Sequence, residues 1–154
     1  MDKKGFTLVE LILVIVIIGI IAAITIPNIM ESLNESKKEG GQSVENLLIE
    51  NLKLYNIDNE EDLWCLEDST GTNCKESGTQ YVDFDDLKRS NPDIDLDQCL
   101  LKNNNSLAIN RSTSGAYTYT AKVICSKDFE KENKDYSVAT AADLNNENIY
   151  YETE

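Results

Sequence analysis

The sequence contains no histidine among its 154 residues. Histidine is the commonest general base and metal ligand at neutral pH, so its absence removes the usual means of acid–base catalysis and metal binding. The chain also has no glycine-rich phosphate-binding loop and no recognisable pairing of a nucleophile with a base. These absences argue against an enzyme, and we expect no catalytic residue, no bound metal and no cofactor.

Basic residues are scarce, because 14 Lys and Arg stand against 28 Asp and Glu and give a formal net charge of -14 at pH 7. A chain this acidic has no bulk electrostatic attraction for nucleic acid or for an anionic membrane surface. We therefore expect no direct nucleic-acid binding, and we interpret the charge as that of a solvated surface.

The N-terminus, in contrast, contains a long apolar run. Residues 6–26 include a single ionisable side chain, Glu10. As a helix that rises about 1.5 Å per residue, this run would be about 30 Å long, which is the thickness of a bilayer core. The positive-inside rule places Lys3 and Lys4 in the cytoplasm and the residues after Pro27 outside, so we predict one membrane span.

The apolar run follows a candidate cleavage point instead of preceding it. In an ordinary secretory signal the apolar core comes first and is discarded by cleavage at a small-residue site behind it. Cleavage after Gly5 would remove a leader of residues 1–5, keep the apolar run and make Phe6 the first residue. The alternative is an uncleaved anchor with the same orientation.

Glu10 is the unusual residue of this run, because an acid within a membrane helix costs about 3 kcal/mol and usually has a partner. Residues 6–36 contain no Lys or Arg. A neighbouring copy of the chain would supply a positive charge if cleavage freed the amine of Phe6 at the same membrane depth. The alternative is that the helix macrodipole stabilises Glu10 near the helix start. We favour the intermolecular role because intramembrane acids are generally functional.

Residues 3–11, KKGFTLVEL, followed by the apolar run and Pro27, resemble the N-terminal signature of type IV pilins and the related pseudopilins. The resemblance implies that a prepilin peptidase cleaves after Gly5 and methylates the new amine of Phe6. It also implies that Glu10 is the assembly acid, and that Pro27 is where the helix bends in assembled filaments, in keeping with the donor that proline lacks.

The same resemblance implies an α+β fold, in which a long N-terminal transmembrane and amphipathic helix packs against a small antiparallel β-sheet. The implied partners are further copies of the chain in a helical filament, the prepilin peptidase, an inner-membrane pilus assembly platform, other minor pilins and, before assembly, membrane lipid. The precursor would be a single-pass protein of the cytoplasmic membrane, and the assembled subunit would lie in a cell-surface filament.

Two alternatives to a pilus subunit stay open. One is a pseudopilin of a type II secretion or DNA-uptake (competence) machine, which the N-terminal motif does not distinguish from a pilin. The other is an uncleaved bitopic membrane protein with an extracytoplasmic binding head and no assembly function. Such a protein would keep Met1 and would tolerate substitution of Glu10.

Residues 27–57 are predicted to continue the helix in amphipathic form. Their apolar side chains recur at spacings of three and four, at Val44, Leu47, Leu48, Leu52 and Tyr55. This face is expected to pack on a sheet. Gly40 and Gly41 each cost about 1 kcal/mol relative to alanine in a helix interior. They would either break the helix or form a flexible joint, and the pilin resemblance favours the joint.

Residues 58–154 are predicted to form a globular head, with a connecting loop over residues 56–80 and strands over 107–110, 116–125 and 136–141 in an antiparallel meander. One face of the middle strand is expected to face the helix, namely Tyr117, Tyr119, Ala121, Val123 and Cys125. The tail, residues 143–154, is either a last edge strand or disordered.

Four cysteines, at Cys65, Cys74, Cys99 and Cys125, follow the membrane segment, so they lie on its non-cytoplasmic side in the predicted orientation. An even number there predicts two disulfides, and three pairings are possible. We favour Cys65 with Cys74, which bracket a turn-rich segment, and Cys99 with Cys125, which would join a loop to a strand. A zinc site is the alternative, and the absence of C-x-x-C and histidine argues against it.

Overall fold

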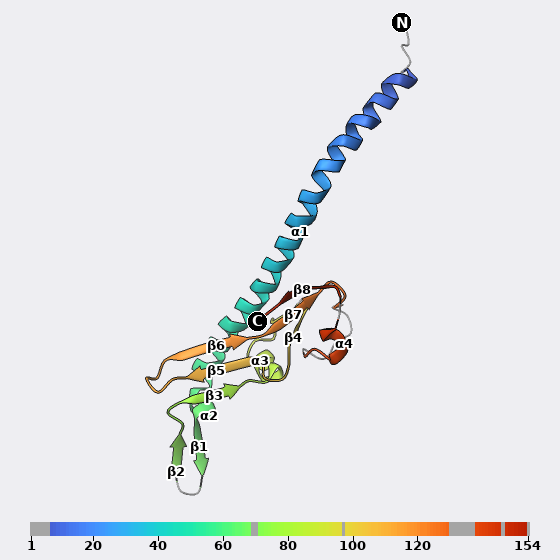
Figure 1. Ribbon diagram of the computed structural model, residues 1–154. Coiled ribbons are helices and arrows are strands. Elements are labelled where there is room, and N and C mark those ends of the chain that lie inside the picture. Colours follow the sequence, from blue (N-terminus) through green and yellow to red (C-terminus); the bar gives the residue numbers. More distant parts are fainter. Residues whose placement is uncertain (1–6, 69–70, 97, 130–137, 146, 154) are drawn as a thin grey trace. The chain divides into compact units, whose positions relative to one another are not determined.

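The computed structural model describes residues 7–68, 71–96, 98–129, 138–145 and 147–153. Within these residues the fold is α+β, with a long N-terminal helix followed by eight short strands in small antiparallel sheets (Figure 1). This confirms the fold class expected from the sequence. The chain divides into two compact units, Met1–Lys37 and Lys38–Glu154.

Helix α1 spans Leu8–Asp58 and has 51 residues. The helix is continuous through Pro27 and through Gly40 and Gly41, so the glycine pair does not break it. The predicted bend at Pro27 concerns assembled filaments and stays a prediction. Within the second unit, α1 supplies the helical face on which the head packs.

The strands of the second unit form three sheets, all of them paired antiparallel. The hairpin sheet consists of β1 (Cys65–Asp68) and β2 (Gly71–Cys74). The second sheet has the order β3 (Gly78–Tyr81), β5 (Leu107–Arg111) and β6 (Tyr117–Ala121). The third has the order β4 (Cys99–Leu101), β7 (Val123–Ser126) and β8 (Ile149–Glu152). Three short helices accompany them, α2 (Glu60–Trp64), α3 (Phe84–Ser90) and α4 (Ala141–Leu144).

The core of the second unit lies between α1 and the strands. Leu48 and Leu52 of α1 are 0% exposed and lie in one buried cluster with Ala121, Val123 and Cys125, and the half-buried Tyr117 and Tyr119 pack against it. The structure therefore confirms the strand face predicted from the spacing of apolar residues. It confirms the helical face except at Leu47, which is 42% exposed and does not belong to the cluster. Strand β7 is buried on its other face as well, where Ile124 packs with Leu100 and Phe129.

The loop predicted for residues 56–80 is wrong, because this segment contains α2, the β1–β2 hairpin and β3. Short polar strands carry no apolar alternation, so their pairing leaves no pattern in the sequence. Trp64, at the end of α2, is 1% exposed, and its Nε1–H donates a hydrogen bond of 3.1 Å to Oδ1 of Asn56. The guanidinium carbon of Arg111 lies 5.7 Å from the centre of the Trp64 ring, so a cation–π contact joins the second sheet to α2.

The single strand predicted over residues 116–125 is two strands, and this prediction is also wrong. Lys122 separates β6 from β7, since its N–H donates to the carbonyl of Ser106 at 2.9 Å and its own carbonyl accepts from the N–H of Lys102 at 3.0 Å. The chain therefore leaves the second sheet at this residue and enters the third.

The third strand of the predicted meander, residues 136–141, is wrong over its described part, residues 138–141, where Val138 forms only an isolated parallel bridge with Leu101. Its last position begins α4 instead, where Thr140 and Asp143 form a reciprocal capping box. For the tail, the structure selects the edge strand of the two alternatives, because β8 pairs with β7 at the end of the third sheet.

Helix α1 and strand β8 approach each other very closely at Gly41. A Cβ atom on Gly41 would lie 2.3 Å from Cγ and 2.6 Å from Cβ of Tyr151. The Tyr151 hydroxyl donates to Oε2 of Glu45, and the Thr153 hydroxyl donates to the same oxygen at 3.0 Å. Burial, reinforced by the bond to Glu45, raises the pKa of Tyr151 above its ordinary value. These contacts fix the C-terminal strand on the helix.

The structure contains two disulfides, Cys65–Cys74 and Cys99–Cys125. Each joins residues that are directly paired in a sheet, the first in the β1–β2 hairpin and the second between β4 and β7. Cys99 and Cys125 are 3% and 0% exposed, so the second disulfide is part of the core.

Replacing both Cys99 and Cys125 by alanine is expected to lower the free energy of unfolding more than the same double replacement of Cys65 and Cys74. The Cys99–Cys125 disulfide connects residues 26 apart, and the Cys65–Cys74 disulfide connects residues 9 apart. Restriction of the unfolded chain grows with loop length and is typically worth about 2–4 kcal/mol. Denaturant unfolding of the full chain in detergent measures both losses, and a larger loss from the hairpin pair would contradict this order.

Candidate processing and assembly site

Thr7 and Glu10 form a reciprocal capping box at the start of α1. Gly5 and Phe6, the predicted cleavage residues, lie outside the described residues, and Thr7 is the residue just before the helix. The Glu10 N–H donates to Oγ1 of Thr7 at 3.3 Å, while the Thr7 N–H and hydroxyl donate to Oε2 of Glu10 at 2.9 and 2.8 Å. The box satisfies donors that a helix start leaves without intrahelical partners.

The sequence contains the pattern of this cap, which was not among the predicted features. Thr7 and Glu10 have the spacing of a capping box, Thr-x-x-Glu, directly before an apolar run. The hydrogen bonds between Thr7 and Glu10 show that groups at the start of the helix stabilise the Glu10 carboxylate, as the alternative to an intermolecular role expects. They do not neutralise the carboxylate, because Glu10 makes no ion pair with any described residue.

The helix that carries Glu10 exposes its apolar side chains along the first unit. Its window Leu8–Thr25 has a mean hydropathy of 3.0 and is 0% buried, so by length and composition this helix is able to cross a membrane. The Thr25 hydroxyl donates to the Ile21 carbonyl at 3.0 Å, so this polar group is satisfied within the helix, as a membrane interior requires. Apolar surface on this scale indicates contact with lipid or with other protein.

Comparison with known proteins relates the same region to filament subunits. Residues 1–26 match the family described as the prokaryotic N-terminal methylation motif. The chain is 37% identical to competence protein ComGC of Bacillus subtilis over 60 residues. This matched segment is 39% of this chain and 61% of the relative. It is 39% identical over 57 residues to type II secretion system core protein G of Escherichia coli, covering 37% of this chain and 39% of the relative.

A third relative is the type IV wide pilus major component PilA4 of Thermus thermophilus, with 39% identity over 58 residues, 38% of this chain and 44% of the relative. The matches thus cover less than two thirds of the length of these relatives. No solved structure gives a significant match to the chain.

The chain is similar to proteins that carry an N-terminal methylation motif directly before a helix long enough to span a membrane. Its matched motif, residues 1–26, and the apolar window Leu8–Thr25 place it in this class. Within this class, the motif and the three relatives support assignment to the type IV pilin and pseudopilin family. Members of that family are structural subunits and not enzymes.

Proposed function

We propose that this chain is a structural subunit of a type IV pilus filament, made as a membrane-held prepilin. A prepilin peptidase cleaves it after Gly5 and methylates the amine of Phe6. The observation that carries the proposal is the match of residues 1–26 to the methylation motif, with Glu10 as the one acid of the apolar run, residues 6–26. The processed chain then passes to an assembly platform in the inner membrane.

In the proposed filament, the exposed apolar side chains of α1 leave lipid and pack against the same segment of neighbouring subunits. Contacts that join different surfaces of identical subunits do not close on themselves and produce open helical filaments. The capping box engages Oε2 of Glu10, while Oε1 makes no hydrogen bond to a described residue. That oxygen is therefore available for the Phe6 amine of a neighbouring subunit.

The proposed location changes with assembly, from the cytoplasmic membrane before processing to a cell-surface filament afterwards. The other partners are membrane lipid before assembly and minor pilins within the filament. The net charge of -14 disfavours direct nucleic-acid binding by this subunit.

A pseudopilin is the second candidate, because two of the relatives are named as a competence protein and a type II secretion core protein. It would use the same processing and the same helix contacts in a shorter fibre. The two candidates differ in what fails when the subunit is lost, which is surface filaments in one case and secretion or DNA uptake in the other.

The experiment that tests the proposal is deletion of the gene, followed by complementation with the wild type, Gly5→Val or Gly40→Ala. Gly5→Val removes the small residue at the cleavage point, whereas Gly40 lies outside the apolar run, and a Cβ on it meets nothing within 4 Å, so Gly40→Ala serves as the matched control. Wild type and Gly40→Ala are expected to restore surface filaments, and Gly5→Val is not. Loss of secretion or DNA uptake with normal filaments would favour the pseudopilin. Full function of uncleaved Gly5→Val would favour the bitopic membrane protein.

A further inference from the structure

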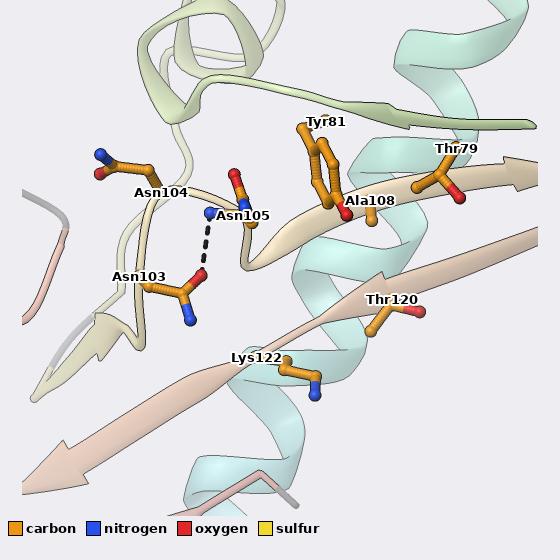
Figure 2. Close-up of a pocket in the computed structure, with 8 residues that line it drawn as sticks. All are labelled: Thr79, Tyr81, Asn103, Asn104, Asn105, Ala108, Thr120 and Lys122. Carbon is orange, nitrogen blue, oxygen red and sulfur yellow. Dashed lines mark hydrogen bonds between the residues drawn. The ribbon is translucent and has the colours of Figure 1, made fainter.

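A polar pocket of about 600 Å³ lies on one face of the β3–β5–β6 sheet, beside the connection between β4 and β5 (Figure 2). A cross-strand row forms its base, because Tyr81 of β3 pairs with Ala108 of β5, which in turn pairs with Thr120 of β6. The neighbouring position in β5, Ile109, is 0% exposed and points to the core on the other face. We call this pocket the Tyr81 groove.

The smallest side chain at the base of the Tyr81 groove belongs to the middle strand of the sheet. Ala108 is the small residue in the middle of the row, and Tyr81, 56% exposed, stands beside it (Figure 2). Adjacent strands are about 4.8 Å apart, so the outer two residues of the row are separated by roughly 10 Å. This width admits one six-membered ring, with the apolar face of the ring against the tyrosine.

Amide groups lie at the end of the groove, in the β4–β5 connection. Oδ1 of Asn103 accepts from the Asn105 N–H at 2.9 Å, and the Asn103 N–H donates to the Ser106 hydroxyl at 2.7 Å, so the connection is held by its own bonds. Nδ2 of Asn103 and the side-chain amide of Asn105 make no hydrogen bond to a described residue. A fixed backbone that presents unused amides suits a ligand rich in hydroxyl groups, since each amide both donates and accepts.

Lys122 lines the groove and is charged, and no Asp or Glu among the described residues lines it. Acidic residues outnumber basic ones by 28 to 14 in the whole chain, yet Lys122 forms no ion pair with a described residue. The nearby Lys102, in contrast, pairs with Glu152 at 2.6 Å. Hydrogen bonds to Lys102 and Ser106, at the two ends of the β4–β5 connection, hold the backbone of Lys122 in place. The groove therefore offers one positive charge that a ligand carboxylate would pair with.

We propose that the Tyr81 groove binds an acidic saccharide. One sugar ring packs on Tyr81 over Ala108, its hydroxyl groups bond to Asn103 and Asn105, and its carboxylate pairs with Lys122. Single-stranded nucleic acid also stacks on aromatic rings, but it needs a series of basic residues along its phosphates and the groove has one. The proposal concerns the second unit alone and does not depend on filament assembly.

The test uses the full oxidised chain in neutral detergent, titrated with tetragalacturonate as the acidic probe and followed by calorimetry. Chitotetraose is the neutral probe and oligothymidylate the nucleic-acid probe. We expect saturable binding of tetragalacturonate, and about tenfold weaker binding in Tyr81→Ala and in Lys122→Gln, as for loss of one good contact. Tyr81→Phe keeps the ring and is expected to bind. Lys88→Gln, at an exposed lysine outside the groove, is the matched control.

Several results would overturn the proposal. These are no binding of tetragalacturonate, equal binding of chitotetraose, binding of oligothymidylate alone, or full binding by both Tyr81→Ala and Lys122→Gln. Thermal unfolding of each variant shows whether it is folded. If Tyr81→Ala is unfolded, the Lys122→Gln variant decides the test. The proposal expects this variant to lose its preference for tetragalacturonate over chitotetraose, and an unchanged preference would overturn it.

Discussion

Glu10→Gln is expected to reduce incorporation of the chain into filaments by at least about tenfold, while leaving membrane insertion unchanged. Glutamine is able to replace glutamate in a capping box, so the bonds with Thr7 are retained. The negative charge is lost, and with it the proposed pair with the Phe6 amine of a neighbour. Removing one partner of a buried ion pair costs about 3–5 kcal/mol, which exceeds the free energy of a tenfold change.

Two matched variants separate the charge of Glu10 from its cap. Thr7→Ala removes the cap at a cost of about 1 kcal/mol and keeps the charge. Glu35→Gln removes an acid of α1 that lies outside the apolar run. Both are expected to assemble far better than Glu10→Gln. The measurement is the fraction of each variant in sheared filaments relative to membranes. Normal assembly of Glu10→Gln together with failure of Thr7→Ala would show that the cap matters and the charge does not.

Gly41→Ala is expected to lower the free energy of unfolding of the second unit, although alanine is the better helix former. The added Cβ would lie 2.3–2.6 Å from atoms of Tyr151 that are close to its backbone and have little freedom to move. Overpacking of this kind typically costs about 1–3 kcal/mol. Strand β8 would be displaced from α1, together with the bonds of Tyr151 and Thr153 to Glu45.

The adjacent glycine is the matched control for Gly41. A Cβ on Gly40 meets nothing within 4 Å, so Gly40→Ala is expected to stabilise the helix by about 1 kcal/mol. Denaturant unfolding of the full chain in detergent compares the two variants. Tyr151→Ala removes the clash, so Gly41→Ala is expected to cost little in that background. Equal stabilisation by both glycine variants would contradict the close approach of β8.

Burial patterns made much of this fold predictable from the sequence. A helix face that packs on a core repeats its apolar residues at three and four positions, and Leu48 and Leu52 follow that spacing. A strand buried on one face alternates, as Tyr117, Tyr119 and Ala121 do. The membrane-length helix required only an apolar run of sufficient length.

Features that depend on tertiary hydrogen bonds escaped the same reasoning. The β1–β2 hairpin is polar and short, and the break at Lys122 is caused by bonds to two distant residues of the chain. Of the candidate site, the placed acid was evident, whereas its cap with Thr7 was overlooked. The Tyr81 groove left no pattern, because only the strand register brings together residues from three strands and a connection.

Mass spectrometry of the native chain tests the central claim, which is processing as a prepilin. We expect an N-terminal peptide that begins with N-methyl-Phe6. We also expect an intact mass that lacks residues 1–5, carries one added methyl group and is four hydrogens lighter because of the two disulfides. A chain that retains Met1 and the rest of the leader in assembled or membrane fractions would contradict it.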